Sequence, residues 1–96
     1  MATGPRRYRE VLLRPLLLRA LNKNQILILS EVGSASITCL LKGLSKENRI
    51  PLSTLKLNAK ILKGLGLVEY GQFRDAKLTD AGYLILNLIK NDDANR

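Results

Sequence analysis

Apolar residues recur at helical spacing from the start of the chain. Over residues 6–21, leucines alternate with arginines in a pattern typical of an amphipathic helix. Pro15 lacks an N–H group and its ring clashes with the preceding turn, so either the helix kinks there or a new helix begins with Pro15 in its first turn. The segment carries an apolar stripe that requires a partner surface: Leu12, Leu13, Leu16, Leu17 and Leu21.

The same periodicity predicts three further helices, over residues 24–32, 37–45 and 54–65. Side chains that can accept a hydrogen bond from the first N–H groups of a helix precede them: Asn22 or Asn24, then Ser36, then Ser53. Gly33 and Gly66 are expected to end the first and the last of these helices. A polar turn over residues 46–52 is expected to join the other two.

The remaining third of the chain predicts a β-hairpin and a last helix. The hairpin consists of a strand over 67–70, a turn over 71–75 and a returning strand over 76–79. Thr79 is the expected cap of a helix over residues 80–91. The predicted fold is therefore mainly α with a small β-hairpin, an α+β arrangement.

The helix expected at 54–65 has two different sides. At about 100° per residue, Lys56, Lys60 and Lys63 lie within about 60° of one another. The opposite side is largely apolar and consists of Leu55, Asn58, Ala59, Ile61, Leu62 and Leu65. A row of charges on a helix is often only a solvated face, but no acidic residue lies between Pro51 and Val68 to neutralise it.

Net charge favours a polyanionic partner. The chain has 96 residues, enough for one domain, and carries a net charge of +8. Residues 1–65 hold 12 basic and 3 acidic residues, whereas residues 66–96 hold 4 and 5. Nucleic acid is the commonest partner of such a surface.

Several kinds of chemistry are excluded or disfavoured. The chain has no histidine and one cysteine, so an imidazole base, an internal disulfide and a zinc cluster are all ruled out. Cys39 is expected to be a small buried thiol. No nucleophile–base pair or phosphate-binding glycine loop is present, and we expect neither an enzyme nor a cofactor. The apolar stretches are too short for a membrane span and the N-terminus does not fit a signal peptide, which predicts a cytoplasmic protein.

Four short motifs resemble a known family in their order and spacing. Ser36-Ile37-Thr38 with Leu40-Leu41, followed by residues 50–55 (IPLSTL), resembles the helix-turn-helix of small prokaryotic winged-helix transcription regulators, archaeal ones included. Leu62 followed by Gly66-Leu67-Val68 is similar to their junction between helix and wing. Residues 78–82 (LTDAG) are similar to the segment that leaves the wing. The resemblance covers about residues 24–90.

The resemblance implies a DNA-binding protein with a recognition helix at 53–65, which enters the major groove, and a wing at 70–77, which lies on the flanking backbone. The positions that would contact double-stranded DNA are Ser53, Thr54, Lys56, Leu57, Lys60, Lys63, Arg74 and Lys77. Two departures from the family pattern are a long turn at 46–52 and a short wing. The exposed side of the helix also lacks Arg and Gln, which make many bidentate contacts to bases.

The two ends of the chain favour a homodimer. The helices at 6–21 and 80–91 are more apolar than one small domain can bury, although they could also cover the domain's own core. We therefore divide the chain into residues 1–23 and 80–96, for dimerisation, and residues 24–79, for DNA binding. Arg6, Arg7 and Arg9 form either a phosphate-binding arm or a solubilising terminus. For Phe73 three alternatives remain open: it contacts DNA, it stacks on a partner, or it is exposed without a contact.

A second function from another class remains open. A winged helix can also be a scaffold that binds an acidic protein through its lysines and does not bind a specific DNA sequence. The preponderance of lysine over base-reading side chains favours this alternative. No small-molecule effector is evident.

Overall fold

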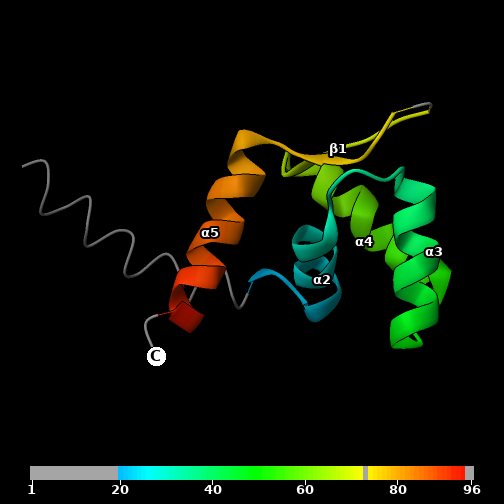
Figure 1. The fold of residues 1–96 in the computed structure, drawn as a ribbon, viewed down its shortest axis with the longest axis horizontal. Coiled ribbons are helices and arrows are strands. Elements are labelled where there is room, and N and C mark those ends of the chain that lie inside the picture. The colour runs from blue at the N-terminus through cyan, green and yellow to red at the C-terminus, as the bar shows by residue number, and fades with distance from the viewer. Residues whose placement is uncertain (1–19, 73, 95–96) are drawn as a thin grey trace, which may run out of the picture.

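The computed structural model describes residues 20–72 and 74–94, and this part of the chain is mainly helical (Figure 1). It contains four helices and a two-stranded antiparallel sheet: α2 (Lys23–Glu31), α3 (Ile37–Asn48), α4 (Leu52–Gly64), β1 (Val68–Glu69), β2 (Lys77–Leu78) and α5 (Asp80–Ala94). The expectations for Arg6, Arg7, Arg9, Pro15, most of the first leucine stripe and Phe73 lie outside the described residues.

Three of the expected helix caps are confirmed. Asn22 caps α2 in a capping box, in which its side chain accepts from the N–H of Gln25 and the Gln25 side chain accepts from the N–H of Asn22. The Ser36 hydroxyl accepts from the N–H of Cys39 at the start of α3. The Thr79 hydroxyl accepts from the N–H of Gly82 in the first turn of α5.

The expected end of the third helix is wrong. α3 continues to Asn48, and its C-cap is Arg49 in the left-handed region, with φ 54°. The Ser45 hydroxyl donates to the carbonyl of Ile50, and the Ile50 N–H donates to the Ser45 carbonyl, so the chain reverses at once. The turn between α3 and α4 is therefore only 49–51, and the long turn expected at 46–52 is absent.

The expected cap of the fourth helix is also wrong. α4 begins at Leu52 rather than Thr54, its N-cap is Pro51, and no side chain caps it. The ring of Pro51 fixes φ near the helical value, and its carbonyl accepts from the N–H groups of Thr54 and Leu55. A helix can therefore start directly after the proline, which places Ser53 inside the first turn.

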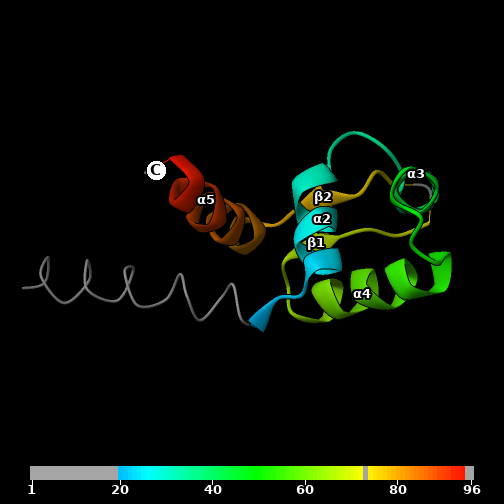
Figure 2. The ribbon, with the colours of Figure 1, turned by 90° about the horizontal axis from the view of Figure 1, so that it is seen from below.

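The core is centred on α4. This helix packs against α2, α3 and β1, and α5 packs against α2 and β2. The largest of the fully buried side chains are Ile28, Leu29, Leu55, Leu62 and Val68. Figure 2 shows α4 along one face of the molecule, with α2, α3 and both strands on its inner side.

A buried polar cluster joins α2 to α4. The side-chain oxygen of Asn58 accepts from the amide of Asn22 (2.9 Å) and from the amide of the buried Gln25 (3.1 Å). The Asn58 amide donates to the Thr54 carbonyl (2.9 Å), so both polar atoms of this buried side chain have partners. Because buried amides without partners are costly, the cluster fixes the position of α4 against the start of α2.

The hairpin is anchored to the helices at its base and along one arm. β1 and β2 pair Val68 with Leu78 and Glu69 with Lys77, over fewer residues than expected. The segment before α3 pairs with the returning arm, through a bridge between Ser36 and Asp75 and a bond from the Ala76 N–H to the Ala35 carbonyl (2.9 Å). A third extended segment therefore lies beside the two strands.

The chain leaves the hairpin through a tight junction. The Thr79 hydroxyl donates to the carbonyl of Gly66, which has φ 77° after the end of α4, and the Thr79 N–H donates to the Leu67 carbonyl. A Cβ atom on Gly82 would overlap the Leu67 carbonyl oxygen and lie 3.2 Å from the Leu78 side chain. Only glycine therefore fits where the first turn of α5 packs against Leu67, in the segment between α4 and β1.

Two burial expectations are wrong. Cys39 is exposed, because the buried side of α3 is formed by Leu41 and Leu44 and the cysteine lies outside it. Ile61 and Leu65 are 41% and 59% exposed, because the elements packed on α4 cover only its Leu55 side. Within the described residues, no helix combines the length and apolar character that crossing a membrane requires.

Candidate nucleic-acid interface

The lysines of α4 are exposed along one edge of the helix. Lys56, Lys60 and Lys63, which we call the lysine edge, are all exposed at spacings of four and three residues. The buried residues Leu55, Asn58, Ala59 and Leu62 lie on the side that faces the core. The expected division of this helix is therefore present, and no described part of the chain covers the lysines.

Tyr70, just after β1, brings the hairpin against the lysine edge. The Lys63 ammonium lies 4.6 Å from the centre of the Tyr70 ring, a cation–π contact that joins α4 to the hairpin. Burial raises the pKa of the Tyr70 hydroxyl above its usual value. The ring is half-buried, so the hairpin is held beside the lysines rather than free of them.

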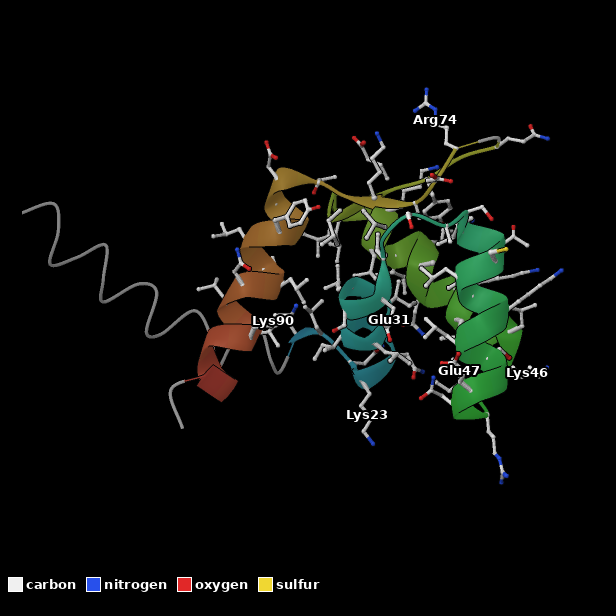
Figure 3. All side chains as sticks on the ribbon, in the orientation of Figure 1. Lys23, Glu31, Lys46, Glu47, Arg74 and Lys90 are labelled. Atoms are coloured by element: carbon white, nitrogen blue, oxygen red, sulfur yellow. The ribbon has the colours of Figure 1, made fainter. Side chains whose placement is uncertain are left out.

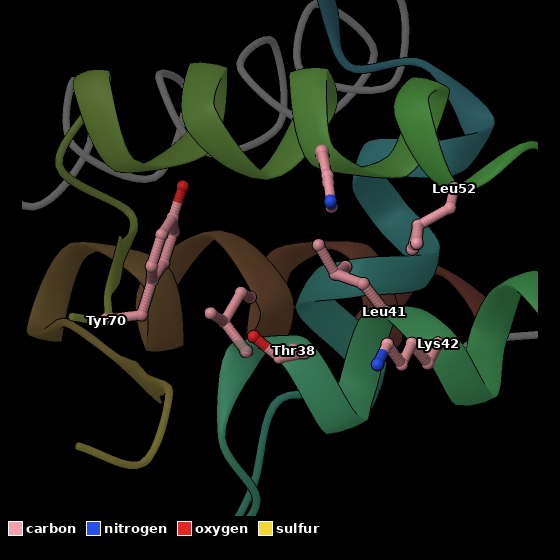
Figure 4. A pocket seen from close by; sticks show the side chains of 7 residues that line it. Thr38, Leu41, Lys42, Leu52 and Tyr70 are labelled. Atoms are coloured by element: carbon pink, nitrogen blue, oxygen red, sulfur yellow. The ribbon is translucent and has the colours of Figure 1, made fainter. Parts of the chain in front are cut away.

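A pocket of about 120 Å³ separates α3 from α4 next to Tyr70 (Figure 4). Its apolar part is formed by Ile37, Leu41 and Leu52. Lys42 on α3 and Lys56 on α4 both line it, and no carboxylate is among the described residues that do so. The cationic surface therefore continues from α4 onto α3, which the sequence alone did not indicate.

The other predicted residues of α4 occupy different environments. Ser53 is exposed, and its hydroxyl caps no helix, so it can bond to a partner molecule. Thr54 is half-buried beside Asn58, to which its carbonyl is bonded. Leu57 is 60% exposed. Ser53 and Leu57 thus share the exposed side with the lysines, whereas Thr54 lies at its margin.

The charges of the hairpin are more balanced than those of α4. Arg74 projects away from the helices (Figure 3) and Lys77 is exposed on β2. Lys77 lies directly opposite Glu69 in the sheet, and Asp75 follows Arg74. All four side chains line one hollow of about 360 Å³. The two cations are therefore accompanied by two carboxylates, whereas the lysine edge has none in its own helix.

Several apolar side chains remain exposed in two places. On α4 they are Leu57, Ile61 and Leu65, which follow one another at four-residue intervals and which we call the apolar edge. On α5, Tyr83 and Leu84 are 57% and 59% exposed. Such residues are candidates for contacts outside the chain.

The described residues offer no alternative metal site. Among them, no group of three or more Cys, Asp or Glu side chains lies close enough to hold a metal ion, and the chain has no histidine. The surface described here is thus one of ammonium groups, hydroxyls and exposed apolar side chains. Ammonium groups bind a partner through charge, hydroxyl groups through hydrogen bonds and apolar side chains through close packing.

Comparison with known proteins does not assign the chain to a family. No protein-family model, no curated protein and no solved structure matches it. The function must therefore be argued from the geometry and charge of this surface.

Proposed function

We propose that this protein is a homodimeric winged helix-turn-helix transcription regulator that binds double-stranded DNA without a cofactor or catalysis. In this proposal α4 is the recognition helix in the major groove, and the hairpin between Val68 and Leu78 is the wing. The observation that carries it is the lysine edge, which consists of three exposed ammonium groups on one side of a helix with no carboxylate between Pro51 and Val68.

The arrangement of the elements supports this fold. A helix, an extended segment, two helices, a hairpin and a last helix follow one another, as a winged helix requires. The three-residue turn at 49–51 removes one departure that the sequence had suggested, because it joins α3 and α4 as closely as a helix-turn-helix needs. The position of α4 at one face of the molecule leaves its outer side free to enter a groove (Figure 2).

The distribution of charged and apolar side chains supports different roles for α4, the wing and α5. Lysines neutralise phosphates well and read bases poorly, so the lysine edge would position the protein on the duplex. The wing would add Arg74, which points away from the helices (Figure 3). The exposed side chains Tyr83 and Leu84 on α5 would belong to the dimer contact.

The test is duplex binding by charge-reversed variants. With about six phosphate contacts in a dimer, the logarithm of the association constant should fall with the logarithm of salt concentration with a slope of about −5. Lys56→Glu together with Lys60→Glu should abolish binding at low salt and leave the circular dichroism spectrum unchanged. Fluorescence anisotropy with a random duplex provides the measurement.

A matched control separates this surface from net charge. Lys23→Glu together with Lys46→Glu makes the same change in charge, on exposed lysines of α2 and α3. Lys23 lies on α2 and Lys46 lies one turn beyond Lys42 on α3, so these substitutions should weaken binding far less than the pair on α4. Equal losses in both double variants, or an unchanged affinity and salt slope in the first, would refute the interface.

The exposed apolar edge favours a second candidate, a scaffold that binds another protein. Leu57, Ile61 and Leu65 together would suit a protein surface better than phosphates. This candidate predicts only feeble binding to random duplex even at low salt. The anisotropy titration above therefore distinguishes the two functions before any partner is known.

A further inference from the structure

The outward side of α4 includes an exposed apolar side chain. At 100° per residue, Leu57 lies about 200° around the helix from the fully buried Leu55, so it points almost directly away from the core. It is 60% exposed, and Ile61 one turn later is 41% exposed. By the same spacing, Lys60 lies about 60° from Leu57 on this side, and Lys56 and Lys63 lie about 100° and 120° from Leu57, at its margin.

The outward side of α4 also includes a position without a side chain. Gly64 lies seven residues after Leu57, two turns along the same side of α4. A Cβ atom on Gly64 would meet nothing within 4 Å, so no contact within the described chain requires a glycine there. Because Gly64 has no side chain, a second molecule can approach the backbone closely at this end of the outward side of α4.

An apolar side chain in a major groove has one matching group. Leucine neither donates nor accepts a hydrogen bond, so it cannot pair with the polar edges of the bases. Thymine is the one base that presents a methyl group in the major groove, on C5. A leucine on the groove-facing side, with cations beside it for the phosphates, therefore fits DNA in which thymine methyl groups line the groove.

We infer that Leu57 contacts thymine C5-methyl groups, so that this protein prefers A·T-rich duplex by apolar contact rather than by bidentate hydrogen bonds. The inference rests on the proposed function, since it requires α4 in the major groove. It identifies the class of DNA that the same surface prefers. It also gives Leu57 a role that the lysines cannot fill.

The decisive experiment removes the methyl group alone. The full chain is titrated by fluorescence anisotropy with an alternating A–T duplex and with the same duplex carrying uracil in place of thymine, below both melting temperatures. The two duplexes have the same phosphates and the same hydrogen-bonding groups. Uracil should weaken binding by about fourfold for each methyl group contacted.

A pair of leucine variants assigns the effect to its residue. In Leu57→Ser the ratio of the two affinities should fall by at least half. In Leu65→Ser, which changes a leucine of nearly equal exposure about 80° further around α4, the ratio should stay that of the parent protein. A third duplex pair, alternating G–C with and without 5-methylcytosine, should show tighter binding to the methylated form.

Each result supports or overturns the inference. Equal affinity for the thymine and uracil duplexes would overturn it while leaving DNA binding in place. A ratio that survives Leu57→Ser would show that another residue reads the methyl group. A lack of binding to every duplex would refute the proposed function, and the inference with it.

Discussion

Two glycines of this protein, Gly82 and Gly64, differ in the space that surrounds them. At Gly82, in the first turn of α5, an added Cβ atom would overlap the Leu67 carbonyl oxygen. At Gly64, on the outer side of α4, an added Cβ atom would have open space within 4 Å. The fold therefore requires the first glycine and not the second. A residue that the chain's own packing does not explain is where an external contact should be sought.

The largest effect should come from filling the tight position. Gly82→Ala should lower the free energy of unfolding by about 3 kcal/mol, because the obstructing atom is a backbone carbonyl that cannot rotate away. The Leu67 carbonyl also accepts the Thr79 N–H, so moving it would weaken the junction further. Urea denaturation gives the value. A loss below about 0.5 kcal/mol would mean that α5 does not approach Leu67 so closely.

The opposite change is expected from filling the open position. Gly64→Ala should leave the fold intact and raise the free energy of unfolding by about 0.5 kcal/mol, because alanine loses less backbone entropy in a helix than glycine does. The same variant should bind duplex DNA more weakly if α4 lies in the groove. Parallel urea and anisotropy titrations would measure both quantities. A stability gain without any loss of affinity would contradict the role proposed for this side of α4.

A smaller effect on stability, one that depends on pH, is expected at Tyr70. Burial raises the pKa of its hydroxyl in the folded state, so above the ordinary pKa near 10 the unfolded chain loses its proton first. This contribution to stability is complete below pH 10 and is lost as the pH rises through the folded-state pKa. Tyr70→Phe should therefore lose less stability between pH 9 and pH 11 than the parent protein does. Identical losses in urea titrations at the two pH values would contradict the burial of the hydroxyl.

The sequence predicted the elements well where a local signal marks their ends. Asn22, Ser36 and Thr79 each cap a helix through a bond to the third residue beyond, a signal that depends on neighbours in the chain. Gly66 ends α4 with a positive φ, as expected of a C-terminal glycine. The end of α3 was missed because its left-handed residue is Arg49 rather than a glycine.

One of the other errors has a local cause, and the rest depend on tertiary packing. The predicted start of α4 was wrong because Ser53 was expected to be the N-cap, whereas Pro51 occupies the N-cap position and the helix begins directly after it. The exposure of Cys39, Ile61 and Leu65 depends on how much of each helix its neighbours cover, which a helical wheel does not include.

The candidate site was predictable in part for the same reason. The lysine edge follows from spacing on one helix. Its extension to Lys42 and Tyr70 requires α3, α4 and the hairpin to meet, and the pairing of Lys77 with Glu69 requires the register of the sheet. A contact between distant segments leaves no local pattern in the chain.

The exposure of Cys39 has a practical consequence. It is the chain's single thiol, and the bond at its position is made by its backbone N–H to Ser36, so the sulfur can be derivatised without disturbing the start of α3. A nitroxide spin label attached there needs no mutagenesis. Because each copy would carry one label, pulsed electron paramagnetic resonance on the unmodified sequence would report the spacing of two subunits directly, with and without duplex.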